Sequence, residues 1–332
     1  MLLAQVRRSA AVGWSGYGES RGSLVLPEVS QLGELPTLFG GTQRTRVWWR
    51  AADEWRVDVL SLVGETDTTQ DLTGSWTWVS ADRRATRLDG AAPIRLPSAS
   101  DLVAPVLGRR LAGSSDVSIS RLGERRLAGR ATAGLRLVPR RPSTSTVDSV
   151  ELWVDRQSGL VLEVTVRAGG RVVLDSLLLD LHRGRPSPQR AVFHLPDDAQ
   201  YNRVEVPDLA AQADRFSPFL LPATLAGSSR SDQVEAFRGV AGVATYGSGL
   251  ATFTVLPLPR RTAREVIGRL TPTMPDAARA ELRTPLFTGL VGRSSERADG
   301  RGYLLVGTVP AGVLAAALDQ LLADTPAVRE VS

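Results

Sequence analysis

Hydrophobic and polar residues alternate through most of the first 206 residues, and this period of two restricts the chain to a β fold. In the clearest run, Leu160, Leu162, Val164 and Val166 share one face, and mostly polar residues occupy the other. Comparable runs lie at residues 22–26, 46–50, 55–60, 75–80, 117–122, 134–138, 149–155 and 172–182. Short turns join several of them, and Gly159 in one turn suits a positive φ. We therefore predict a large antiparallel sheet with one dry face.

Three stretches near or between these runs have a different pattern. Residues 2–11 have the spacing of a short amphipathic helix, and residues 27–42 form a loop rich in Gly, Pro and Leu. Residues 100–111 begin with a Ser and Asp cap signal and continue with helical spacing, with Pro105 near the first turn. Because a curved sheet must bury its dry face, we expect the loop and this helix to cover it.

A proline-containing segment at 207–222, with a short helical signal at 209–213, is predicted to link two domains, residues 1–206 and 223–332. The second domain is expected to be small and α+β. Its expected strands and helices are residues 240–246, 250–256, 285–294 and 302–309, and residues 262–270 and 311–322, respectively. Pro310 and a leucine stripe define the start and the apolar face of the last helix.

The amino-acid composition excludes most kinds of catalytic site. The chain has no cysteine and no lysine, and its only histidines are His182 and His194. Thiolate chemistry, disulfides, a Schiff base and a Walker A lysine are therefore excluded. The two histidines lack the close spacing of a metal pair. We predict a protein that is not an enzyme and has no cofactor or metal.

Charge patterning argues against two further functions. The net charge of +5 comes from arginines that alternate with acids, without a basic stripe or a recognition motif, so we expect no nucleic-acid partner. Acid pairs such as Asp53/Glu54 and Glu65/Asp67 are expected in turns, where carboxylates are solvated. A hydrolase that uses such pairs needs two carboxylates in one cleft. It is therefore the weakest of our three functional hypotheses, and the other two, a sensor and a carrier, are described below.

Tryptophans concentrate near the start of the chain, with six of the seven in the first 80 residues. In strands, Trp55, Val57 and Val59 would share a face, and so would Trp76 and Trp78. We expect both sets to point together to one face, which is either an ordinary sheet core or the wall of an apolar cavity for an acyl chain or peptide. The candidate cavity residues are Trp14, Trp49, Trp55, Val57, Val59, Trp76, Trp78, Leu162 and Val164.

Several short sequence motifs follow one another along the first 162 residues. They are WSGYG at 14–18, VWWRAADEWRVD at 47–58, SWTW at 75–78, LAGRATAGLRLVP at 127–139 and LWVDRQSGLVL at 152–162. In this order they resemble the lipoprotein-carrier-like superfamily of LolA, LolB and the RseB/MucB proteins. The resemblance implies an unclosed antiparallel β-barrel around an apolar cavity, with a helical lid. LPATLAG at 221–227 and YGSGL at 246–250 resemble the smaller C-terminal domain of RseB-like proteins.

The resemblance also implies a function. We expect a non-enzymatic, extracytoplasmic sensor that binds a lipid, an acyl chain or a lipoprotein and regulates a membrane anti-sigma factor through its ectodomain, or binds another envelope protein. The alternative is a lipid or lipoprotein carrier of the cell envelope without a regulatory partner. Either protein would be peripheral to or anchored at a membrane, with an export or anchor segment upstream of Met1.

Overall fold

The computed structural model describes residues 2–26, 35–90, 97–205, 220–231, 242–274, 277–294 and 301–323. The chain divides into two compact units. The first unit is Met1–Ser114, Ser118–Val138 and Ser149–Pro207, and the second is Ser115–Val117, Pro139–Asp148 and Asp208–Ser332. Residues 206–219, which include the predicted helix at 209–213 and most of the predicted linker, lie outside the described residues. The predicted linker therefore stays a prediction.

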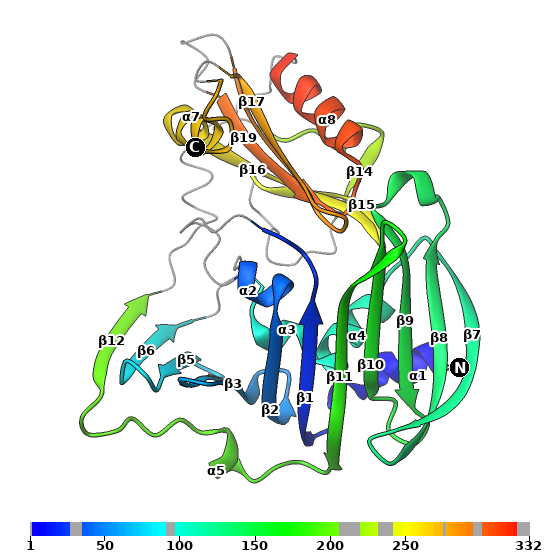
Figure 1. Cartoon of the computed structure of the whole chain (residues 1–332), viewed down its shortest axis with the longest axis vertical. Helices are drawn as coiled ribbons and strands as arrows, with labels where there is room; N and C mark the ends of the chain where they lie inside the picture. Colours follow the sequence, from blue (N-terminus) through cyan, green and yellow to red (C-terminus); the bar gives the residue numbers. More distant parts are fainter. Residues whose placement is uncertain are drawn as a thin grey trace. The chain divides into compact units, whose positions relative to one another are not determined.

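A sheet of twelve described strands forms most of the first unit, in the order β12-β6-β5-β4-β3-β2-β1-β11-β10-β9-β8-β7 (Figure 1). The strands are β1 Trp14–Gly22, β2 Thr42–Ala51, β3 Glu54–Ser61, β4 Gly64–Asp71, β5 Gly74–Val79, β6 Arg84–Asp89, β7 Val117–Leu127, β8 Arg130–Pro139, β9 Val147–Asp155, β10 Val161–Ala168, β11 Arg171–Arg183 and β12 Gln200–Glu205. Its outermost strands, β12 and β7, are not neighbours, so the sheet does not close. The prediction of an unclosed β-barrel is confirmed.

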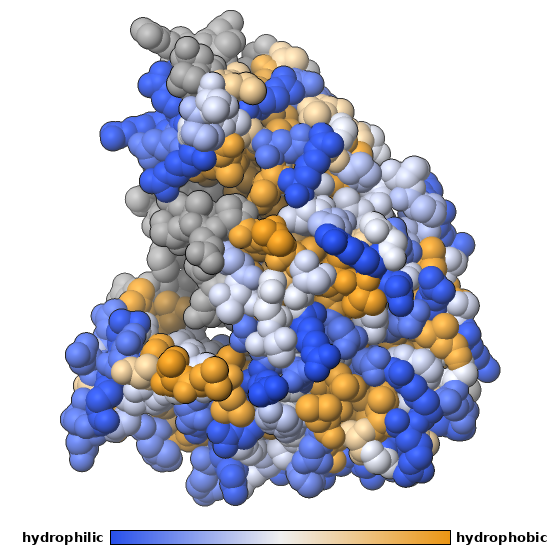
Figure 2. Space-filling view, in the orientation of Figure 1, coloured by the Kyte–Doolittle hydropathy of each residue, from blue (hydrophilic) through white to orange (hydrophobic). Residues whose placement is uncertain are grey.

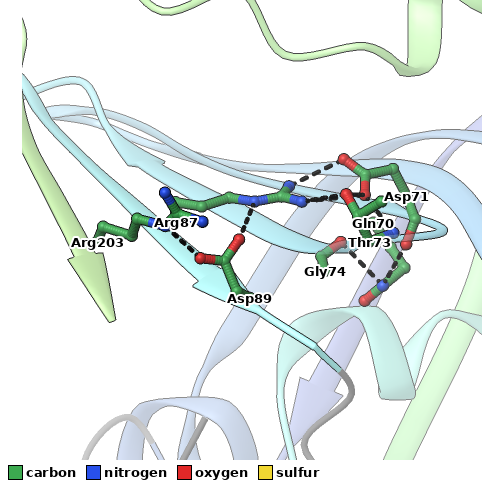
Figure 3. A network of polar contacts seen from close by, with 7 residues as sticks. All are labelled: Gln70, Asp71, Thr73, Gly74, Arg87, Asp89 and Arg203. Carbon is green, nitrogen blue, oxygen red and sulfur yellow. Dashed lines mark hydrogen bonds and ion pairs between the residues drawn. The ribbon is translucent and has the colours of Figure 1, made fainter. Parts of the chain in front are cut away.

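Two meanders, β1–β6 and β7–β11, are joined by the antiparallel pairing of β1 with β11. This pairing aligns Trp14 with Arg183 and Gly22 with Leu174. One edge departs from the predicted antiparallel pattern, because β12 pairs with β6 in parallel. Arg203 of β12 also forms an ion pair with Asp89 of β6 (Figure 3).

Short helices accompany the sheet of the first unit. They are α1 Leu2–Arg8, a 3-10 turn at Ser9–Ala11, α2 Leu35–Gly40, α3 Ala99–Leu102, α4 Ala104–Ala112 and α5 Pro188–Ala191. Residues 27–34 of the predicted loop lie outside the described residues. The single helix predicted at 100–111 is two helices, because Pro105 has no amide hydrogen to continue α3 and instead lies in the first turn of α4.

Helices α3 and α4 cover one face of the sheet. The hydroxyl of Ser176 in β11 donates a hydrogen bond to the carbonyl of Leu102, at the end of α3. Gly108 brings α4 close to β10, since a Cβ at this position would lie 2.6 Å from the Val161 side chain. The predicted helical lid is confirmed.

Several strand boundaries differ from the predictions. The strand predicted at 22–26 is wrong, because β1 ends at Gly22. Strands β1, β4, β6 and β12 of the first unit were not predicted, and the acids Glu65 and Asp67, expected in a turn, lie within β4. Strand β4 consists of Gly, Thr, Gln and acidic residues, so it has no hydrophobic alternation to mark it. The positive φ expected at Gly159 is observed, at 76°.

The second unit contains a sheet of seven described strands, in the order β13-β14-β15-β16-β19-β18-β17. Its elements are β13 Thr224–Leu225, β14 Ser228–Ser231, β15 Ala244–Ser248, β16 Ala251–Pro259, α7 Arg260–Leu270, β17 Arg279–Arg283, β18 Thr288–Arg293, β19 Arg301–Gly307 and α8 Ala311–Ala323. The expected α+β architecture is confirmed.

The two helices of the second unit pack on opposite faces of its sheet. A Cβ at Gly292 would meet Leu318 of α8, whereas one at Gly302 would meet Ala263 of α7. Gly302 lies opposite Arg293 and not Gly292 in the register, so the two glycines face different sides. Figure 1 shows α7 and α8 on the two sides of this sheet. Leu314 and Leu318 of the predicted leucine stripe are fully buried.

Exposed hydrophobic side chains of the first unit include those of two turns. Leu62 and Val63 lie between β3 and β4, and Leu72 lies between β4 and β5. Figure 2 shows hydrophobic surface in the region that Figure 1 labels β3 and β5. Among the described residues, no helix combines the length and the hydrophobicity that crossing a bilayer requires.

Candidate functional site: a cavity beneath the helical lid

The register of β3, β4 and β5 assigns their residues to two faces of the sheet. Trp55 lies opposite Gln70, which lies opposite Ser75, so these side chains share one face. We call it the inner face, because α3 and α4 cover it. Arg56 lies opposite Thr69, which lies opposite Trp76, so these residues belong to the outer face.

A cavity of about 670 Å³ lies on the inner face, between the strands and the lid helices. Its walls come from β2 and β3, from β4, β5 and β6, and from α3 and α4. A second cavity of about 240 Å³ adjoins it and shares Thr66, Thr68, Ser98 and Ser100. Val57 and Val59 line this smaller cavity. The sequence left a packed core and a cavity as alternatives for this face. The structure has cavities there.

A stack of three tryptophans forms the aromatic wall. The ring centroids of Trp14 and Trp49 are 6.4 Å apart, and those of Trp49 and Trp55 are 5.7 Å apart, with nearly parallel planes in both pairs. Trp49 and Trp55 line the larger cavity, whereas Trp14 is buried behind them. The register accounts for the stack, because β1, β2 and β3 place these residues directly opposite one another.

The lid supplies a positive charge above this wall. The guanidinium carbon of Arg109 in α4 lies 5.7 Å from the ring centroid of Trp49. Burial, with a smaller effect from neighbouring Arg110, lowers the pKa of Arg109. A guanidinium over an indole face forms a favourable cation–π contact. Arg109 thus places a cation at the aromatic side of the cavity.

The opposite wall carries polar side chains, so apolar residues alone do not line the cavity. Strands β4 and β5 contribute Thr66, Thr68, Gln70, Ser75 and Thr77 to the lining. The carboxyl group of Asp101 in α3 also lines the cavity, and it forms an ion pair with Arg110 over 2.7 Å between Oδ1 and Nη1. A site with one aromatic and one hydroxyl-rich wall suits an amphiphile better than a wholly apolar molecule.

Two of the predicted site residues are on the wrong face. Trp76 and Trp78 were expected to point with Trp55, but the register places them on the outer face. There the ring centroid of Trp76 lies 5.0 Å from that of Phe193 and 5.6 Å from that of Tyr201. Strand alternation alone cannot relate the faces of two strands, because a one-residue shift in pairing reverses them.

Two other predicted residues share the inner face without lining either cavity. Leu162 and Val164 are fully buried in β10, the strand against which α4 packs. They belong to the packed part of the inner face. Some of the predicted site residues therefore line a cavity, whereas others lie in the packed part of the same sheet. A ligand-binding role stays a prediction for all of them.

The sequence did not lead us to predict the polar wall of the cavity or the guanidinium group of Arg109. Thr66 and Thr68 alternate in a stretch bounded by Gly64 and Gly74, and this spacing of β-branched residues is the signal that could have found β4. Arg109 was visible only as part of an arginine doublet. Its position over Trp49 depends on how α4 crosses the sheet, which the sequence does not encode locally.

Comparison with known proteins gives a fold match. No protein-family model matches this chain. No curated protein matches it in sequence. Among solved structures, the complex of Pseudomonas aeruginosa MucA and MucB matches with a TM-score of 0.54 and 17% identity, covering 99% of this chain and 98% of that chain. A crystal structure of MucB in complex with MucA(peri) matches with a TM-score of 0.52 and 18% identity, covering 99% of this chain and 98% of that chain. The chain therefore has the fold of MucB, the RseB-like fold that its sequence motifs predict.

Proposed function

We propose that this chain is a non-enzymatic, extracytoplasmic sensor that holds an amphiphile with an acyl chain and binds the ectodomain of a membrane anti-sigma factor. The observation that carries the ligand part is the cavity of about 670 Å³ with its stacked indoles, its hydroxyl-rich wall and Arg109. Its volume lies within the usual range of roughly 300–1,000 Å³ for small-molecule sites. The acyl chain packs along the indoles, and the polar wall accepts the head group.

Similarity to MucB supports the partner part. The two MucB structures compared above both contain MucA as well, and each match extends over nearly the whole length of this chain. We assign partner binding to residues 223–332, because the sequence resemblance relates this part to the C-terminal domain of RseB-like proteins. A regulator of this kind needs no catalytic residue.

Native mass spectrometry of the purified full-length chain tests the ligand part. We expect a copurified lipid, identified after organic extraction. Thr68→Phe projects a ring into the cavity and is expected to abolish lipid retention while the chain stays folded. Ser120→Phe, at an exposed position of β7, is the matched control and retains the lipid. Equal retention by both variants contradicts a ligand in this cavity.

Hydrogen exchange of the full-length chain, with and without a membrane anti-sigma ectodomain, tests the partner part. Protection is expected within residues 223–332. Protection restricted to the first unit contradicts the assigned role, and the absence of any protection across a series of such ectodomains contradicts the partner class.

The second candidate is a carrier that passes lipids or lipoproteins onward. The cavity and its lid favour it as much as they favour the sensor. A carrier transfers its ligand between donor and acceptor vesicles without a protein partner. A sensor retains the ligand in that assay and changes its affinity for the ectodomain when the ligand is present.

A hydrolase has less support. Asp53 and Asp101 both line the cavity, but Asp101 is engaged by Arg110 and accepts hydrogen bonds from the amide and the hydroxyl of Ser98. A carboxylate held by three donors is a poor general base, because these bonds stabilise its charged form.

A further inference from the structure

Three acidic side chains meet on the outer face of β3 and β4, away from the cavity. Asp58 and Asp67 lie directly opposite each other in the register, and Glu65 shares their face two residues before Asp67. Asp58 is 2% exposed and Asp67 is 5% exposed. One carboxylate oxygen from each of the three lies within 4.8 Å of the other two. We call this group the acidic triad.

Two arginines balance the triad incompletely. Arg56 contacts Asp58 at 2.6 Å (Nε to Oδ1) and Asp67 at 2.8 Å (Nη2 to Oδ2), and Arg46 contacts Glu65 at 3.0 Å (Nη2 to Oε2). When all three carboxylates are ionised, the two guanidinium groups leave one negative charge. A buried charge without a partner is costly, so the triad favours either a proton on Asp67 or a further cation.

One oxygen of the triad has no partner. Oδ1 of Asp67 is buried and receives no hydrogen bond from any residue that the structure describes. Since Oδ2 of the same carboxylate is bound to Arg56, Oδ1 is the atom left to meet a cation. Nearly all buried polar atoms in folded proteins have a partner, so this exception requires either a proton shared with Asp58 or a bound cation.

We propose that Asp58, Glu65 and Asp67 bind a divalent cation of the calcium class. The site offers only carboxylate oxygens, which hard cations such as Ca²⁺ and Mg²⁺ prefer over zinc or copper. Oxygens that share one Ca²⁺ at about 2.3–2.6 Å lie within about 5 Å of each other, as these do. The Glu65 side chain is 36% exposed and gives access to solvent and to coordinating water. Calcium tolerates such irregular geometry, whereas Mg²⁺ requires a near-ideal octahedron.

A cation at this position links β3 to β4, whose inner face carries Val57, Val59, Thr66 and Thr68 of the cavity walls. The inference is independent of the proposed function, because it rests on the opposite face of the sheet. Burial, followed by the charge of Asp58, raises the pKa of Asp67 to about 7, so protons compete with the metal. The binding experiment therefore belongs at pH 8.

Terbium luminescence of the full-length chain tests the site, because Tb³⁺ substitutes for Ca²⁺ and is excited through a nearby indole. Trp78 lies directly opposite Asp67 in the register. After treatment with a chelator, we expect one Tb³⁺ per chain with sensitised emission, and displacement by CaCl₂. Asp67→Asn and Glu65→Gln each weaken Ca²⁺ binding roughly tenfold or more, because each removes a charged ligand. Asp180→Asn, at an exposed carboxylate, leaves it unchanged.

Thermal unfolding provides the second measurement, and it also verifies that each variant is folded. Adding CaCl₂ after chelation raises the Tm of the wild-type chain and leaves that of Asp67→Asn unchanged. A Tm that responds to pH and not to CaCl₂ shows that the triad takes only a proton and overturns the proposal. Unchanged Ca²⁺ affinity in Glu65→Gln, a partly exposed position that tolerates substitution, overturns it as well. Displacement of Tb³⁺ by MgCl₂ at lower concentrations than CaCl₂ overturns the calcium assignment.

Discussion

Arg87 of β6 contacts the turn between β4 and β5 through its guanidinium group. It contacts Asp71 over 2.9 Å (Nη1 to Oδ2) and Asp89 over 3.1 Å (Nε to Oδ1), and it donates a hydrogen bond to Thr73 (Figure 3). Asp89 in turn pairs with Arg203. The turn between β4 and β5, strand β6 and strand β12 are thus tied together at one edge of the sheet.

Asp71 makes this edge sensitive to acid. Burial alone would raise the pKa of Asp71, but hydrogen bonds from Arg87 and Thr73 outweigh it and lower the pKa to about 2. Because the folded state depresses the pKa below its unfolded value near 4, the pairing stabilises the fold above that value. This contribution is lost as the pH falls from about 4 to about 2.

Asp71→Asn is expected to reduce stability at pH 7 by about 1 kcal/mol or less, since the carboxylate is 43% exposed and solvent screens the pair. The variant should also have a flatter dependence of stability on pH between 4 and 2. Urea unfolding at several pH values checks both effects, with Asp180→Asn as the exposed control. An unchanged acid slope in Asp71→Asn contradicts this role.

Residue identity predicted which side chains are large and apolar but not which face they occupy. Trp49, Trp55, Val57 and Val59 line the cavities as expected, because alternation within a strand is a local property. The face that Trp76 and Trp78 occupy could be predicted only from the pairing of β4 with β5. The unpredicted strand β4 is the one that separates them, so a single missed element explains the error.

At the scale of elements, the fit of α4 against β10 depends on the absence of a side chain at Gly108. The helix was predictable from its cap signal and spacing, but its contact with Val161 was not, because helix packing depends on shape across segments far apart in sequence. The packing of the lid helix α4 on the sheet depends on this contact.

Gly108→Ala is expected to destabilise the chain by about 1–3 kcal/mol, because a methyl group at 2.6 Å from Val161 overpacks the contact. Gly268→Ala in α7 is the matched control. A Cβ there meets nothing within 4 Å, so the better helix propensity of alanine should stabilise by up to about 1 kcal/mol. Denaturant unfolding measures both changes. Stabilisation by both substitutions contradicts the close packing of the lid.

For the whole molecule, local periodicity predicted a mainly β fold and a smaller α+β part, and the family resemblance implied the helical lid. The sequence did not predict the pairing of β1 with β11, which joins two meanders across more than 150 residues in sequence. No local pattern encodes such a partner. The parallel pairing of β12 is unpredictable for the same reason.

For the whole molecule, we propose that the cavity on the inner face of the first unit binds a ligand. Quenching of tryptophan fluorescence by a fatty acid brominated on its chain tests it directly, because bromine quenches only indoles that it approaches closely. We predict strong quenching in the wild-type chain and in Trp76→Phe/Trp78→Phe, and its loss in Trp49→Phe/Trp55→Phe. Equal quenching in the two double variants, or none in the wild-type chain, would contradict the cavity as a ligand site.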